Sequence, residues 1–273
     1  MSVLAQRFTF GALALGIVGG LVGLDYWLES RLGLLSLLLF LTIGGWFEYT
    51  RLAGCATRWT RTVGVGGLLA SLIGFYATSV SGTLFHQVVP ALVPTLFVLG
   101  LLASAPSKDK LQGLGLATLG FYYLVYPAQL CFALYSSTVN GGTCILLLLL
   151  LVKGNDIGAF LVGRKFGKTP LTQVSPNKTV EGSVGGLALG LIVAIAFATI
   201  PETPLITLTK AIALGVVVGI MGQLGDLVES YLKRVAGAKD SGNLLPAFGG
   251  ILDLLDSPWF ALPTFYFLLM LPF

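Results

Sequence analysis

Long apolar segments separated by short polar stretches run along almost the whole chain. A membrane-spanning helix needs about 20 mostly apolar residues, and nine segments approach that length. These segments are 8–28, 32–50, 63–81, 84–104, 111–135, 141–163, 182–200, 207–229 and 257–273. The pattern predicts an all-α polytopic integral membrane protein with about nine transmembrane helices. The last segment contains three prolines, which predict a kinked or only partly crossing helix.

Composition supports the same class of protein. Hydrophobic residues make up 55% of the 273 residues and charged residues only 10%, whereas soluble domains have about 25% charged residues. The 36 glycines are typical of transmembrane helices that pack backbone to backbone. The apolar run after Arg7 resembles a signal peptide, but it is long and lacks a small-x-small cleavage site. We therefore expect a retained first helix.

Basic residues indicate which side of the membrane each loop faces, because cytoplasmic loops carry an excess of Lys and Arg. With the N-terminus inside, 13 of the 16 basic residues fall on the inner side. The sequence therefore predicts a cytoplasmic N-terminus and an active site at the cytoplasmic face, in loops 164–181 and 230–256. We expect a single membrane domain, 1–273, with N-terminal spans in about 1–140 and a catalytic region in about 141–273.

The stretch 226–257 concentrates charge in an otherwise apolar chain. It holds five of the 12 acidic side chains, namely Asp226, Glu229, Asp240, Asp253 and Asp256. Charges in a membrane protein are costly and are usually retained for function. A helix places Asp253 and Asp256 on one face, and Mg²⁺ commonly binds a couple of carboxylates plus substrate phosphates. Asp226 interrupts a long apolar run, so we predict that it joins Asp253 as a metal ligand, with Asp256 in support.

Simpler interpretations of these acids stay open. Asp253 and Asp256 also suit the polar start of a helix, where a negative charge is favourable. Glu229 and Lys233 also suit an ordinary i,i+4 ion pair.

Two further stretches carry unusual polar residues. The loop after the sixth segment contains four cations among Gly, Ser and Thr donors, a composition that suits phosphate oxygens. The cations are Arg164, Lys165, Lys168 and Lys178. Ordinary positive-inside charge is the alternative interpretation. Inside the sixth segment, Lys153 and Asp156 lie at i,i+3, where they can neutralise one another or Asp156 can serve the site.

Two separated blocks carry a specific family pattern. The chain matches S-x-x-K-R-x(4)-K-D-[ST]-G-x-x-[LI]-P-G-H-G-G-[ILM]-x-D-R-[IFL]-D-S at most of its defined positions, from Ser230, Lys233 and Arg234 to Asp253, Asp256 and Ser257. Upstream, 156–182 is similar to D-[ST]-G-A-Y…G-[RK]-x-F-G-K…S-P-x-K-[ST]-x-E-G. Together the blocks resemble the phosphatidate cytidylyltransferase family, also called CDP-diacylglycerol synthases. The resemblance covers roughly 150–257.

The chain also departs from the family pattern. Ala247 and Phe248 replace the glycine and histidine of P-G-H-G-G, and Leu254 replaces the arginine of D-R-x-D. Lys153 replaces an aromatic residue, and Phe160 replaces the tyrosine of G-A-Y. Loss of the basic residues beside the metal pair is expected to weaken phosphate binding, shift substrate choice or abolish turnover.

The resemblance implies a definite reaction. The phosphate of phosphatidic acid attacks the α-phosphorus of CTP and gives CDP-diacylglycerol and pyrophosphate, with Mg²⁺ as cofactor and room for a second cation. The expected partners are these two substrates and membrane lipids but no nucleic acid, with a homodimer left open. The expected location is the inner (cytoplasmic) membrane.

The resemblance also implies roles for individual residues. The catalytic set is Asp226, Lys233, Lys239, Asp240, Asp253 and Asp256, of which Asp226, Asp253 and Asp256 bind metal. The set that binds substrate or phosphate is Asn155, Asp156, Arg164, Ser175, Lys178, Thr179, Glu181 and Arg234.

Three other functions stay open from the sequence. One is a related CTP-using lipid-phosphate enzyme or a polyprenol-type kinase. Another is a catalytically silent paralogue, and the third is a membrane transporter. Against transport, the two halves show no inverted repeat, and the polar groups cluster at one face instead of the midplane.

Overall fold

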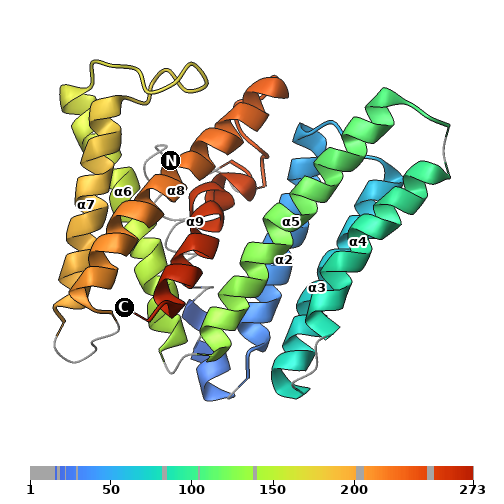
Figure 1. Cartoon of the computed structure of the whole chain (residues 1–273), viewed down its shortest axis with the longest axis horizontal. Coiled ribbons are helices and arrows are strands. Elements are labelled where there is room, and N and C mark those ends of the chain that lie inside the picture. Colours follow the sequence, from blue (N-terminus) through green and yellow to red (C-terminus); the bar gives the residue numbers. More distant parts are fainter. Residues whose placement is uncertain are drawn as a thin grey trace. The chain divides into compact units, whose positions relative to one another are not determined.

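The computed structural model describes residues 16, 19–21, 23–28, 30–81, 85–103, 105–137, 140–200, 206–244 and 249–272. Within these ranges the chain is helical and contains no strand, apart from an isolated bridge between Pro170 and Thr179. The helices are α2 (Leu32–Leu52), α3 (Arg58–Ser81), α4 (Phe85–Leu102), α5 (Lys108–Ser137), α6 (Gly141–Phe166), α7 (Val180–Ala198), α8 (Leu208–Val235) and α9 (Leu252–Met270) (Figure 1). The predicted first span, 8–28, lies mostly outside the described residues.

The other eight predicted segments each coincide with one of these helices. Five of the described helices are long and apolar enough to cross a membrane, namely α2, α5, α6, α7 and α8. The all-α membrane class is thereby confirmed, whereas the count of nine spans and the orientation stay predictions. The helix ends differ from the expected loops, because α8 continues to Val235 and α9 begins at Leu252.

The chain forms two compact units. The first comprises Met1–Phe132 and Val235–Leu254, and the second comprises Ala133–Arg234 and Leu255–Phe273. The first unit therefore contains α2, α3, α4 and most of α5. The second contains α6, α7, nearly all of α8, and α9 beyond its first turn. The prediction of a single domain with a catalytic region after residue 140 stays a prediction, and the structure adds that 235–254 groups with the N-terminal helices.

Aromatic side chains build the core of the first unit. Trp46 of α2 is fully buried and stacks on Tyr49 and Phe97, with ring centroids 6.4 and 6.2 Å apart. The Tyr49 hydroxyl donates to the Leu116 carbonyl of α5 at 3.0 Å. Buried aromatic hydroxyls usually find such a partner. These contacts hold α2 against α4 and α5, which fixes the end of α2 that carries polar residues.

Glycines build the core of the second unit. At the crossing of α6 and α7, a Cβ on Gly158 would lie 2.6 Å from the Gly185 carbonyl oxygen and 3.1 Å from the Cα of Gly186. Only glycine permits two helix backbones to approach so closely. Figure 1 shows α6 and α7 side by side along their length. The abundance of glycine therefore has the packing role that the sequence predicted in this pair.

Candidate active site

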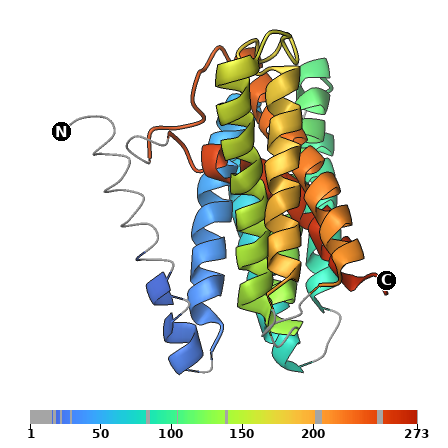
Figure 2. The ribbon, with the colours of Figure 1, turned by 90° about the vertical axis from the view of Figure 1, so that its left-hand side faces the viewer.

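The loop between α6 and α7 lies at one end of these two helices (Figure 2). Hydrogen bonds within the loop and to the start of α7 stabilise its conformation. The Glu181 carboxylate accepts from the backbone N–H groups of Lys168 and Thr169 at 3.1 and 3.2 Å. The Thr179 hydroxyl accepts a backbone N–H of the first turn of α7 at 3.1 Å and so caps that helix. These bonds hold the backbone on both sides of Lys178.

A cavity of about 450 Å³ lies beside this loop in the second unit. Six predicted site residues line it, namely Asn155, Asp156, Arg164, Lys178, Thr179 and Asp226. The polar residues Asn177, Ser183 and Gln223 also line it, together with apolar side chains such as Phe160. A concave site with a few polar groups among apolar ones is typical of ligand sites. This mixture suits a compound that has both a phosphate and an apolar part.

Gln223 of α8 joins three helices at the cavity wall. Its side-chain N–H groups donate to Asn155 Oδ1 at 2.9 Å and to the Ser183 carbonyl at 3.0 Å. Its side-chain oxygen accepts from the Ser183 hydroxyl. Asn155 is only 1% exposed, so these bonds satisfy a buried amide. The sequence analysis missed Gln223, although an amide in an apolar helix three residues before Asp226 was an available signal.

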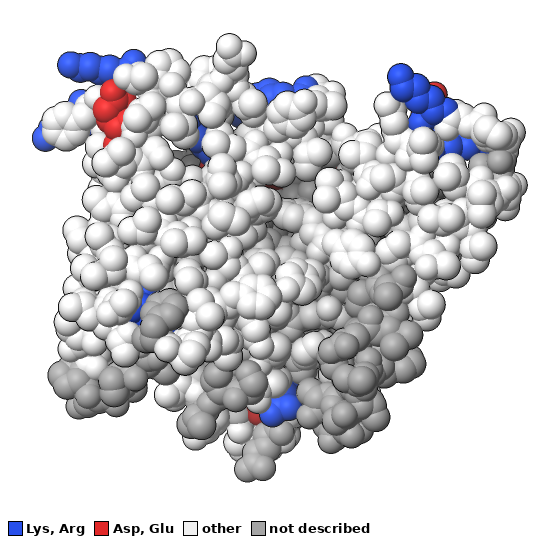
Figure 3. Space-filling view, viewed as in Figure 1, with Lys and Arg blue, Asp and Glu red and all other residues white. Residues whose placement is uncertain are grey.

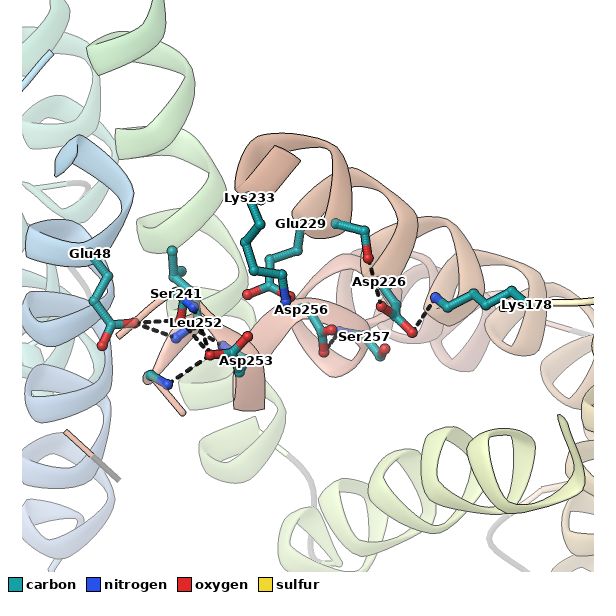
Figure 4. Close-up of polar contacts among 12 residues, drawn as sticks. Glu48, Lys178, Asp226, Glu229, Lys233, Ser241, Leu252, Asp253, Asp256 and Ser257 are labelled. Carbon is teal, nitrogen blue, oxygen red and sulfur yellow. Dashed lines mark hydrogen bonds and ion pairs between the residues drawn. The ribbon is translucent and has the colours of Figure 1, made fainter. Parts of the chain in front are cut away.

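Three carboxylates come together in the second unit, and one of them, Asp226, also lines the cavity. One oxygen each from Asp226, Glu229 and Asp256 lies within 4.8 Å of the other two. Helix α8 supplies the first two from one face, and α9 supplies the third (Figure 4). Gly225 permits this approach, because a Cβ there would overlap the Asp256 carbonyl oxygen. Asp226 and Asp256 were predicted as metal ligands, whereas Glu229 was predicted only as a partner of a lysine.

Two lysines balance part of this negative charge. Lys178, from the α6–α7 loop, forms an ion pair with Asp226. Lys233 Nζ lies 2.6 Å from Glu229 Oε2, which confirms the predicted i,i+4 pair. The Glu229 side chain is 2% exposed and that of Lys233 14%, so this second pair is buried. Both lysines have flexible stems and can move when another cation arrives.

The acid group fits a divalent cation. Asp256 stands near the start of α9, which is not among the five candidate spans. Burial, followed by the negative charge of Asp226, raises the pKa of Asp256 to about 6. A raised carboxyl pKa means that the anion is poorly compensated, and a bound cation supplies that compensation. Carboxylate oxygens are also the ligands that Mg²⁺ prefers.

In the first unit, Asp253 is wrapped by the loop that precedes it. Its Oδ2 accepts from the Ser241 N–H at 2.9 Å, the Ser241 hydroxyl at 2.8 Å and the Gly250 N–H at 2.7 Å. Gly249 has a φ of +95°, a conformation that glycine adopts easily. The backbone therefore turns tightly just before Asp253. The metal-binding role of Asp253 stays a prediction.

Glu48 of α2 is a second carboxylate on the same loop. It is 8% exposed and accepts from the Ile251 N–H at 3.0 Å, the Leu252 N–H at 2.9 Å and the Ser241 hydroxyl at 3.0 Å (Figure 4). N–H groups at a helix start lack partners within the helix, so Glu48 caps α9. The sequence analysis missed it, although a lone acid near the end of an apolar segment was a signal.

The other predicted site residues lie at helix ends or in loops. Lys233 and Arg234 form the basic last turn of α8, and Arg164 lies in the last turn of α6. Ser175 accepts from the Lys178 N–H at 3.0 Å through its carbonyl oxygen. Lys239 and Asp240 are exposed in the loop between α8 and α9.

The departures from the family pattern differ in their surroundings. Lys153 lies 3.1 Å from Asp156 Oδ2, which confirms the predicted i,i+3 pair. Phe160 lines the cavity, and Leu254 is 37% exposed. Ala247 and Phe248 lie outside the described residues.

Charge is unevenly distributed over the second unit. In Figure 3 most of the Lys and Arg side chains visible on this part of the molecule lie at the end that carries the α6–α7 loop, while the sides of the helices show few charged residues. Exposed apolar side chains such as Ile157, Leu161 and Ile192 lie on those sides. An apolar belt with charge at one end fits helices that cross a bilayer and handle a charged substrate at one face.

Comparisons with known proteins agree with this arrangement. The model of the cytidylyltransferase family matches residues 5–271. A phosphatidate cytidylyltransferase of Bacillus subtilis is 38% identical over 186 residues, which are 66% of this chain and 67% of that protein. Proteins of the same name from Synechocystis sp. and Helicobacter pylori are 47% identical over 116 residues and 40% identical over 148 residues. The matches to these two cover 42% and 53% of this chain, and 39% and 54% of those proteins, so the chain spans only part of their length. The chain belongs to the cytidylyltransferase family, as the sequence resemblance predicted.

Proposed function

We propose that this protein is a nucleotidyltransferase that moves CMP from CTP to phosphatidic acid, giving CDP-diacylglycerol and pyrophosphate. The observation that carries the proposal is the cavity of the second unit with its polar side chains. This cavity, lined by Lys178, Asn155 and Asp226, lies in a helical bundle whose sides are apolar. The same aspartate joins the acid group. Family membership and the names of the relatives support the same activity.

The proposed setting is the inner membrane, with the N-terminus and both polar loops in the cytoplasm. The support is the excess of basic residues in the loops that this orientation places inside. A lipid phosphate then reaches the site sideways from the bilayer, while CTP enters from the cytoplasm. Nine spans belong to this proposal, and a homodimer remains a prediction that the single chain leaves open.

Asp226 and Asp256 would hold Mg²⁺, with Glu229 as a third oxygen donor. When bound, the cation neutralises negative charge that builds on the reacting phosphates. Other residues of the chain hold these carboxylates in place. Gly225 sets the approach of α8 to the Asp256 backbone, and Lys233 keeps the buried Glu229 carboxylate compensated. A second cation stays part of the proposal without assigned ligands.

Lys178 and Arg164 would bind phosphate oxygens in the cavity. Lys178 pairs with Asp226. The loop hydrogen bonds hold only the backbone around Lys178, so its ammonium group can exchange the carboxylate for a phosphate. Phosphoryl and nucleotidyl transfer depends mostly on positioning and electrostatic stabilisation. Asn155 and Gln223 hold the cavity wall rigid, so the substrate meets a preformed surface.

A reconstitution experiment tests the proposal. Purified protein in detergent receives phosphatidic acid, labelled CTP and Mg²⁺, and CDP-lipid and pyrophosphate are measured. We expect both products in equal amounts from the wild type, and their loss in Asp226→Asn and Asp256→Asn. Asp109→Asn, which changes an exposed acid in the first turn of α5, is the matched control and should keep activity. A wild type that forms no product with several lipid phosphates overturns the proposal and favours a silent paralogue.

A further inference from the structure

Glu48 connects parts of the sequence that are far apart. It lies on α2, yet its partners Ile251 and Leu252 are 203 and 204 residues later in the chain. Its Oε1 accepts from one of these N–H groups, and its Oε2 accepts from the other and from the Ser241 hydroxyl. Both carboxylate oxygens are therefore used to hold the start of α9 and the loop before it.

The loop is shaped around this carboxylate. A Cβ on Gly242 or Gly250 would overlap the Glu48 carboxylate oxygens, so a side chain at either position would displace that carboxylate. Arg51, one turn after Glu48 on α2, donates to the Ser241 carbonyl. Ser241 is thus held from α2 at its hydroxyl by Glu48 and at its carbonyl by Arg51.

Ser241 relays this contact to Asp253. Its hydroxyl oxygen lies 3.0 Å from Glu48 Oε2 and 2.8 Å from Asp253 Oδ2. A serine hydroxyl has one proton to donate, so the two carboxylates share a single donor. The Ser241 N–H also donates to Asp253 at 2.9 Å. Movement of Ser241 therefore changes two of the bonds that orient Asp253.

We propose that Glu48 is a positioning residue of the transferase reaction. It fixes Ser241 and the first turn of α9, and through Ser241 it orients Asp253, a predicted site residue. The inference rests on the proposed function. Glu48 is buried beneath the loop and touches no cavity described above, so it acts through other residues rather than on substrate.

The test measures kcat and KM separately in the CDP-lipid assay. Residues that orient a site through others typically cost about 10- to 100-fold in activity when changed. We expect Glu48→Gln to lower kcat by about that factor and to leave KM for CTP nearly unchanged, because substrate contacts are intact. Thr50→Val is the matched control. Thr50 is also buried on α2, but its hydroxyl donates to the Trp46 carbonyl of its own helix, so kcat should stay at the wild-type value.

A double-substitution cycle separates positioning from general stability. If Glu48 acts through Ser241, Glu48→Gln combined with Ser241→Ala loses hardly more activity than the worse single variant. Additive losses, or a folded Glu48→Gln enzyme with wild-type kcat, overturn the proposal. Thermal unfolding in detergent shows whether Glu48→Gln folds. If it does not, Ser241→Ala alone carries the test, because it removes the relay and keeps both caps from Glu48. Wild-type kcat in Ser241→Ala then overturns the proposal. An inactive wild type instead refutes the proposed function.

Discussion

Two carboxylates of the first unit and two of the second are held by different kinds of donor. In the first unit, Glu48 and Asp253 accept hydrogen bonds from backbone N–H groups and a serine hydroxyl. In the second unit, Asp226 and Glu229 pair with lysine ammonium groups. Backbone donors are fixed by the fold, whereas an ammonium group on a flexible stem can move away.

This difference indicates different roles. A carboxylate held by several fixed N–H groups keeps one orientation, since nothing can replace those donors without moving the backbone. A carboxylate balanced by a mobile lysine can exchange that lysine for a metal ion or release it to a phosphate. The second unit therefore has the arrangement expected for chemistry, and the first has the arrangement expected for positioning.

The largest expected effect follows from Asp226→Asn. It removes a carboxylate from the acid group and the partner of Lys178. Charge stabilisation by a metal is worth several kcal/mol, so CDP-lipid formation should fall by about 1000-fold. The melting temperature should hold or rise, because one like charge leaves the group. Measured turnover above about a tenth of the wild-type value would remove Asp226 from the metal site.

Lys233→Met should mainly affect stability. It leaves the buried Glu229 carboxylate without its ammonium partner, which typically costs about 3 kcal/mol. Thermal unfolding in detergent should show the loss, and added Mg²⁺ should recover more of it than in the wild type, because a ligand of the folded state stabilises it. Lys165→Met, an exposed lysine in the last turn of α6, is the control. Equal melting temperatures of the two variants would contradict this account of the pair.

Lys178→Met should change two kinetic constants in opposite directions. Loss of a cation from the cavity should raise KM for CTP about tenfold, the factor that corresponds to one charge-assisted hydrogen bond of about 1.5 kcal/mol. The Mg²⁺ concentration for half-maximal rate should fall, because Lys178 no longer competes with Mg²⁺ for the Asp226 carboxylate. Lys168→Met in the same loop is the control. A rise in both constants would show that Lys178 does not balance Asp226.

The smallest effect is expected from Lys153→Met. The side chains of Lys153 and Asp156 are 57% and 39% exposed, and neither residue belongs to the acid group. Turnover should therefore fall less than in Lys178→Met, and the melting temperature should change less than in Lys233→Met. A larger loss of turnover would mean that Lys153 replaces charge that other family members supply elsewhere.

Local patterns in the sequence predicted local contacts well. The i,i+4 pair of Glu229 and Lys233 and the i,i+3 pair of Lys153 and Asp156 follow from helix geometry alone. The eight predicted apolar segments are helices because a long apolar run in a membrane satisfies its backbone groups within a helix. Helix ends were predicted less well, because α8 ends later and α9 begins earlier than the apolar segments do. The added residues include charged ones, which the sequence analysis assigned to a loop.

Contacts between distant segments could not be predicted in this way. The pair of Lys178 and Asp226 depends on how a loop folds back, and the cap of α9 by Glu48 joins positions about 200 residues apart. No periodicity encodes such distances. Glu48 and Gln223 had only one weak signal each, a polar residue in an apolar segment. Their roles depend on partners that only the folded chain brings close.

Direct cation binding tests the central claim that the acid group of the second unit is the metal site. Mn²⁺ can stand in for Mg²⁺, and its electron paramagnetic resonance signal reports free and bound ion in a titration of the purified protein. We expect binding to the wild type and at least about tenfold weaker binding in Asp226→Asn and Asp256→Asn, since each loses a ligand. Asp253→Asn in the same titration decides whether that predicted ligand also contributes. Wild-type affinity in both Asp226→Asn and Asp256→Asn would contradict the account.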